Sequence, residues 1–198
     1  MLTRRHIRVK VLQSVYAFRK NETTNIEAQE KFFLHSLGQI QDLYLLMLQL
    51  LVSIRAYAEV HLEKSSKKHL ASQAEKNPSH VFVNNKLLKL LAGSQSLKKH
   101  IKNKKLDYWK LDGEYVGIIF KELRERQFYQ NYLQQKETSF KEDRAVVLRF
   151  YKEVIAPNDK LYDYIEDKRL TWLNDFPIVN THIVKVLSKI KETNSGDT

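Results

Sequence analysis

The residues best suited to binding chemistry are the basic side chains at the start of the chain. The first 20 positions hold six arginines and lysines, with one histidine among them: Arg4, Arg5, His6, Arg8, Lys10, Arg19 and Lys20. Guanidinium groups pair with phosphate oxygens, often through two parallel hydrogen bonds, and they also stack on planar rings. The segment therefore indicates a surface for a polyanion.

Two further residues of this segment narrow the class of polyanion. On a helix, Arg5, Val9 and Tyr16 fall within about 40° of one another, with Gln13 beside them. Tyr16 could stack on an unpaired base, and Gln13 offers a donor and an acceptor to a base edge. This combination favours single-stranded RNA. A solvated basic face with a half-buried Tyr16 is the alternative that the pattern leaves open.

A second basic run lies in the middle of the chain and is a candidate secondary RNA-binding site. It consists of Lys98, Lys99, Lys102, Lys104 and Lys105. Such a run could follow phosphates beyond the first contact. The alternative, a solvated face of a helix, is the more common role of a lysine run and is favoured here.

The elements that must position these side chains are predicted to be helices. The chain of 198 residues has only 5 Gly and 3 Pro, far below average usage, and no segment alternates with period two. In a first helix over about residues 3–19, Ile7, Val11, Val15 and Phe18 form an apolar stripe. We expect this stripe to pack on the second helix and the opposite, basic face to meet the ligand.

The remaining periodicity predicts an all-α bundle of about seven to nine helices. Residues 1–110 would form an N-terminal RNA-binding part, and residues 111–198 a second helical part. A polar segment, residues 64–80, is predicted as a linker. The principal expected helices begin at Thr24 or Asn25, Asn84, Ser94, Asp112, Thr138 or Ser139, and Ile178, and the one from Asp112 continues to about Gln135.

Composition excludes several classes of protein and limits others. There are no cysteines, so disulfide scaffolds and thiolate metal sites are excluded. The N-terminus has no secretory signal, and the apolar run at residues 43–54 is shorter than the roughly 20 residues that span a bilayer. No metal-binding, nucleotide-binding or nucleophile motif is present. We therefore expect a cytoplasmic, membrane-free protein that is not an enzyme and needs no cofactor or metal.

The N-terminal segment RRHIRVKVLQSVYAF resembles the opening of the NusB family of transcription antitermination factors. That family begins with an arginine-rich stretch followed by an apolar-Gln-x-apolar-Tyr run, here Leu12-Gln13-Ser14-Val15-Tyr16. Compared with shorter NusB proteins, this chain has a long insertion. In this insertion and in the style of its N-terminus it is most similar to the enlarged NusB proteins of the Bacteroidetes type. Residues 146–187 show a weaker similarity to the middle of the family.

The resemblance implies an all-helical fold and a role in transcription regulation. NusB proteins bind boxA, a short single-stranded element of nascent ribosomal RNA, together with the ribosomal protein NusE, within the RNA polymerase antitermination complex. By this resemblance, the residues that contact RNA are Arg4, Arg5, His6, Arg8, Gln13 and Tyr16.

One departure from the family and two other interpretations stay open at this point. The family's C-terminal Phe-x-Asn-Gly-x-Leu-Asp segment is missing, so either the chain is truncated or its C-terminal half has diverged, and the NusE surface is affected. The main alternative function is a helical protein–protein scaffold without specific RNA binding. A basic amphipathic helix for a membrane surface is disfavoured, because the first helix lacks a Trp- and Leu-rich face.

Overall fold

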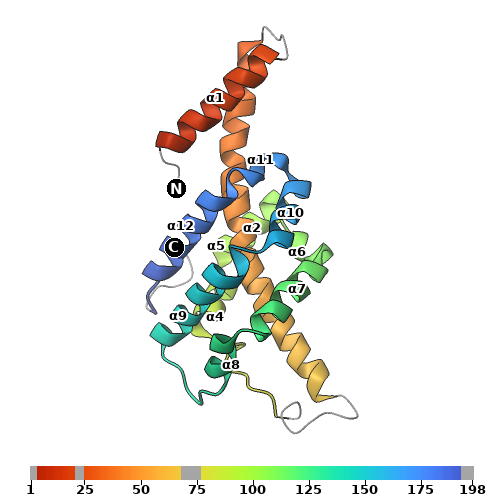
Figure 1. Cartoon of the computed structure of the whole chain (residues 1–198), viewed down its shortest axis with the longest axis vertical. Helices are drawn as coiled ribbons and strands as arrows, with labels where there is room; N and C mark the ends of the chain where they lie inside the picture. The colour runs from red at the N-terminus through yellow and green to blue at the C-terminus, as the bar shows by residue number, and fades with distance from the viewer. Residues whose placement is uncertain (1–3, 21–24, 68–76, 193–198) are drawn as a thin grey trace.

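The computed structural model describes residues 4–20, 25–67 and 77–192 (Figure 1). These residues form eleven α-helices and one π-helical segment, with no strand among them, so the predicted all-α bundle is confirmed. Two of the helices, α6 and α11, have four residues each. The elements are α1 (Arg4–Lys20), α2 (Ile26–Ser66), α4 (Lys86–Gly93), α5 (Gln95–Lys104), α6 (Tyr108–Leu111), α7 (Gly113–Arg124), α8 (Gln127–Leu133), α9 (Phe140–Phe150), η1 (Tyr151–Ile155), α10 (Asp159–Lys168), α11 (Leu170–Leu173) and α12 (Phe176–Lys189).

Helix α2 is the central axis of the molecule. Its 41 residues form one continuous helix, which begins at the cap Asn25, whose side chain accepts a hydrogen bond from the Ala28 amide at 3.0 Å. The predicted core run at residues 43–54 is confirmed, because Leu43, Leu46 and Leu50 are inaccessible to solvent. Helices from both halves of the sequence surround this part of α2 and share one core with it.

The length and composition of α2 are also those of a membrane-spanning helix. It is the one such helix in the described part of the chain, and half of its apolar 18-residue window is buried inside the protein. A core helix of a globular protein has the same properties. The feature therefore does not distinguish the two environments.

Two tryptophans attach short helices to this axis. The indole N–H of Trp109, in α6, donates to the carbonyl of Leu46 at 2.8 Å, and that of Trp172, in α11, donates to the carbonyl of Gln39 at 2.9 Å. A buried indole needs such a partner, because leaving its N–H unpaired is costly. These bonds fix where α6 and α11 lie along α2.

Several predicted boundaries differ from the structure. The cap of α4 is Asn85, not Asn84, because the buried Asn85 amide also donates to the Tyr132 hydroxyl at 3.0 Å. The helix predicted from Asp112 to Gln135 is two helices, since the chain turns after α7 and α8 then buries Phe128 and Tyr129.

The segments predicted to interrupt helices also differ in part from the structure. Helix α2 continues through Ser66, into the segment predicted as a linker, and residues 68–76 lie outside the described ranges. Pro177, predicted to precede the last helix, lies in the first turn of α12, where its missing N–H costs nothing. Thr3, the predicted start of the first helix, also lies outside the described part of the chain.

Candidate nucleic-acid interface

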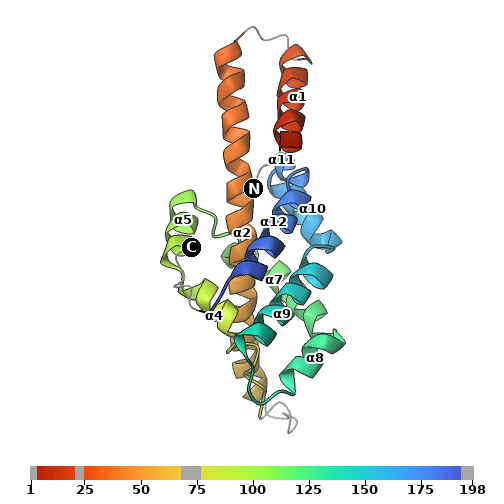
Figure 2. The same ribbon diagram turned by 90° about the vertical axis from the view of Figure 1, so that its left-hand side faces the viewer.

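Helix α1 and the first turns of α2 form a hairpin that projects from one end of the bundle (Figures 1 and 2). The α2 residues of the hairpin are mostly exposed up to His35, and the first buried residue of α2 is Ser36. We call α1 and residues 26–35 the hairpin. It carries all the residues predicted as the primary RNA site.

One buried ion pair joins the hairpin to the bundle. Lys10 is the only buried residue of α1, and its Nζ lies 2.9 Å from Oδ2 of Asp175, the residue before α12. Burial raises the pKa of the Asp175 carboxyl, while the hydrogen bond and charge of Lys10 and the charge of His6 lower it. The net direction is upward, so the ion pair offsets only part of the cost of burying this carboxylate.

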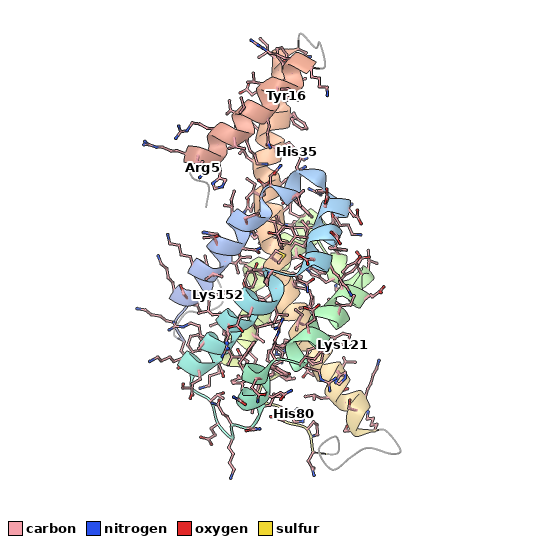
Figure 3. The ribbon with its side chains drawn as sticks, in the orientation of Figure 1. Arg5, Tyr16, His35, His80, Lys121 and Lys152 are labelled. Carbon is pink, nitrogen blue, oxygen red and sulfur yellow. The ribbon has the colours of Figure 1, made fainter. Side chains whose placement is uncertain are left out.

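The outer face of α1 presents unpaired cations. Arg4, Arg5 and Arg8 are exposed, and none of them forms an ion pair with a described residue. The single hydrogen bond among them is a weak one of 3.4 Å from Arg8 Nε to the Arg4 carbonyl. Figure 3 shows Arg5 extending away from α2 into solvent. These guanidinium groups are available to an anionic ligand.

Tyr16 and Gln13 complete this outer face. The Tyr16 side chain is 66% exposed, so its ring is not part of the core. Gln13 is also exposed, and its amide has no hydrogen-bond partner among the described residues. The structure therefore brings Arg5, Gln13 and Tyr16 to one accessible surface. We use the name outer face of α1 for the surface formed by these three residues, Arg4 and Arg8.

His6 has a different position from the other predicted site residues. It is half-buried and engaged in an interaction, and its charge acts on the Asp175 carboxyl. The structure therefore places His6 on the inner side of α1, toward the bundle. It is not grouped with the arginines of the outer face.

Most of the apolar stripe of α1 faces α2, as predicted, but it is not buried there. Ile7, Val11 and Val15 are 40%, 43% and 48% exposed, whereas the inner side of α1 centres on Lys10. Val11, Val15 and Phe18 line an apolar groove of about 380 Å³ between α1 and α2. The side of α1 that meets the end of the bundle carries Lys10 instead, which pairs with Asp175.

Exposed large apolar side chains gather on the hairpin. Among the described residues, nine of the twelve lie there: Ile7, Val9, Val11, Leu12, Val15, Tyr16, Ile26, Phe32 and Leu34. The other three, Tyr57, Val60 and Leu111, lie elsewhere on the surface. An apolar surface concentrated in one element is typical of a binding region.

The second basic run lies on α5. Lys98, Lys99, Lys102 and Lys105 are exposed, while Lys104 forms an ion pair of 3.4 Å with Asp42. Figure 2 shows α5 and α1 on opposite sides of α2, so the two basic runs form separate surfaces. The structure therefore does not place the predicted secondary RNA-binding site on α5 beside the primary site on α1.

Sequence reasoning missed the residues that border the hairpin on its bundle side. Thr171 and Asn174 lie at the foot of α1, where they line a cavity together with Gln13 and Phe32. No periodicity links them to α1, which they approach only because Trp172 fixes α11 to α2. Within the described ranges, no group of His, Asp and Glu residues has the arrangement of a metal site.

Comparisons with protein-family models, with curated proteins and with solved structures found no match for this chain.

Proposed function

We propose that this chain binds single-stranded RNA through the outer face of α1 and is not an enzyme. The observation that supports this most is the set of unpaired, exposed guanidinium groups beside an exposed Tyr16 on a projecting helix. Arginines supply the phosphate contacts that dominate affinity, and an exposed phenol ring supplies a stacking platform that accepts any base. The same face has no acidic residue, since α1 contains none.

The NusB resemblance extends this proposal to a role and to partners. We propose that the RNA is a boxA-like element of nascent ribosomal RNA, bound together with NusE in a cytoplasmic antitermination complex. The support for this step is the arginine-rich run of residues 4–18. It is tested by adding purified NusE to the chain with boxA-like RNA, where a ternary complex of higher affinity than the binary one is expected.

Fluorescence anisotropy with a labelled single-stranded RNA tests the binding site. Arg5→Glu should weaken binding and flatten the salt dependence, by about 0.7 in the slope of log K against log salt for each phosphate that the variant no longer neutralises. Tyr16→Ala should cost about 1–3 kcal/mol of binding free energy and leave the slope almost unchanged. The two variants therefore separate phosphate pairing from stacking.

Two matched controls accompany these variants. Lys152→Glu reverses an exposed charge on the bundle, far from α1, and should leave binding nearly unaltered (Figure 3). Tyr16→Phe keeps the ring and should bind RNA almost as tightly as the parent protein, unlike Tyr16→Ala. If Arg5→Glu and Tyr16→Ala bind RNA as tightly as the parent protein, the site is not the outer face of α1.

A protein–protein scaffold is the second candidate function, favoured by the exposed apolar side chains of the hairpin. In that case the groove lined by Val11, Val15 and Phe18 would bind a partner, and the basic residues would only confer solubility. Phe18→Ala distinguishes the two. It removes an apolar wall of the groove, so it should abolish docking in the scaffold case. In the RNA case it should leave RNA affinity within about twofold, because it changes neither a cation nor the Tyr16 ring.

A further inference from the structure

A cavity with several polar groups in a largely apolar wall lies at the foot of the hairpin, where α1, α2 and α11 meet. Its volume is about 240 Å³, and its walls include Gln13 and Ser14 of α1, Phe32 and Ser36 of α2, and Thr171 and Asn174 around α11. Gln13 and Asn174 are exposed, so the cavity opens to solvent. A space of this kind admits one ring system rather than a segment of protein.

The wall of this cavity has no net charge available to a ligand. Lys10 contributes to the wall, but its ammonium is neutralised by Asp175 at 2.9 Å. The chemistry therefore differs from that of the adjacent outer face, where the arginines are unpaired. A phosphate group fits the outer face better than the cavity, and a neutral ligand fits the cavity better.

The polar groups of the wall match the edge of a heterocycle. The side-chain amides of Gln13 and Asn174 have no hydrogen-bond partner among the described residues, so each offers a donor and an acceptor. The hydroxyls of Ser36 and Thr171 already donate, to the Phe33 carbonyl at 2.7 Å and to Gln39 Oε1 at 2.5 Å, which leaves their oxygens as acceptors. A single Asn or Gln amide can contact a base edge through two hydrogen bonds, as it does with N6 and N7 of adenine.

The cavity also has a stacking surface and fixed walls. Phe32 is 51% exposed and lines the cavity, so its ring can contact a planar group. The α11 wall is held to α2 by the Trp172 indole and by Arg169, which lies 3.6 Å from Asp42. Because the walls are held before any ligand enters, less ordering is needed on binding.

Gln13 connects the cavity to the outer face, because it borders both. A strand bound along the outer face therefore lies next to the cavity mouth at Gln13. We propose that the cavity receives one unpaired base of the bound RNA and that Asn174 reads its edge. This inference rests on the proposed RNA-binding function, and it adds a specific base subsite to a surface that otherwise reads only backbone and ring faces.

The test uses the full chain and RNA selected by it from a randomised single-stranded pool. The selected oligonucleotide, of roughly 12 nucleotides, is then remade as a series in which each position in turn lacks its base. One position should stand out, with about tenfold weaker binding when its base is removed. Asn174→Ala should lower the affinity for the intact RNA by a similar factor. Removing the base at that position should not lower the affinity of this variant any further.

Gln135→Ala is the matched control, since Gln135 is an exposed amide just after α8, and α8 lies at the end of the bundle away from the hairpin (Figure 1). It should retain the full response to every abasic position. If Asn174→Ala responds to all abasic positions as the parent protein does, the cavity is not a base site, although the chain still binds RNA. If no RNA is enriched from the pool, the proposed RNA-binding function is wrong, and the proposed base subsite is wrong as well.

Discussion

The bundle and the hairpin use the same type of element in opposite ways. In the bundle, large side chains such as Phe150, Trp172 and Phe176 are fully buried, and the Trp172 indole N–H is paired. In the hairpin, most apolar side chains are at least 40% exposed, and the one buried residue of α1 is a lysine. The bundle therefore supplies the free energy of folding, and the hairpin presents apolar and cationic surface for contact with something else.

Because of this difference, substitutions in the bundle and in the hairpin should affect different properties, stability in the first case and ligand binding in the second. Burial of apolar surface stabilises a fold in proportion to the area removed from water. The hairpin buries little of its apolar surface, so its side chains can change at small cost to the fold. The same changes should have their main effect on ligand affinity.

The largest expected effect comes from truncating the bundle core. Phe150→Ala should lower the free energy of unfolding by about 3–5 kcal/mol, because it removes a fully buried ring that contacts Phe82 edge to face. Leu12→Ala removes an apolar side chain of the hairpin that is 69% exposed and should change it by no more than about 0.5 kcal/mol. Urea unfolding followed by circular dichroism measures both.

Equal destabilisation by these two variants would contradict the comparison. It would mean that the hairpin is packed as tightly as the bundle in solution. RNA affinity provides the complementary measurement, since Phe150→Ala should leave it unchanged while the protein is folded.

The features predicted from the sequence are those that depend on local periodicity. The all-α class and the buried run of α2 follow from spacing and side-chain chemistry within a few residues. The same reasoning limits the caps of α2 and α9 to two neighbouring residues each, of which the structure uses Asn25 and Ser139. The basic character of α1 and the exposure of Arg5 and Tyr16 follow on the same grounds.

The features that the sequence could not predict depend on contacts between distant segments. Periodicity shows which residues of α1 share a face, but it does not show which face meets the bundle. That is decided by the pairing of Lys10 with Asp175, which lies 165 residues away. The cavity at the foot of the hairpin has the same origin, because Asn174 reaches α1 only through the position of α11.

A somewhat smaller effect is expected from breaking the junction of the two regions. Lys10→Met removes one partner of the buried pair. It should lower the free energy of unfolding by about 3 kcal/mol, since the carboxylate of Asp175 is left without its cation. The pKa of Asp175 is already raised by burial, and it should rise further in this variant. An acid with a folded-state pKa above its unfolded value gains stability as the pH falls through the folded pKa. The deficit of Lys10→Met should therefore shrink on acidification.

The double variant Lys10→Met, Asp175→Asn is the control for this argument. It removes the buried charge, so it should recover most of the stability at neutral pH, and it should lack the gain in stability on acidification that the Lys10→Met variant owes to Asp175. A single variant whose deficit stays constant between neutral and acidic pH would show that the ion pair is not what joins the hairpin to the bundle.

The smallest expected effect compares helix caps in the two regions. Ser139 caps α9 in the bundle with a full capping box, in which the Ser139 amide donates to Glu142 Oε2 at 2.8 Å. Ser139→Ala should cost about 1 kcal/mol of global stability. Asn25 caps α2 in the hairpin by one hydrogen bond of 3.0 Å to the Ala28 amide. Asn25→Ala should instead fray the start of α2 locally, because few buried contacts tie that turn to the rest of the protein.

Amide hydrogen exchange resolves the two cases, with faster exchange confined to the first turn of α2 in Asn25→Ala and spread over the bundle in Ser139→Ala. If both variants reduced global stability equally, the hairpin would be folding as one cooperative unit with the bundle, and the two regions would not differ in how they use their side chains.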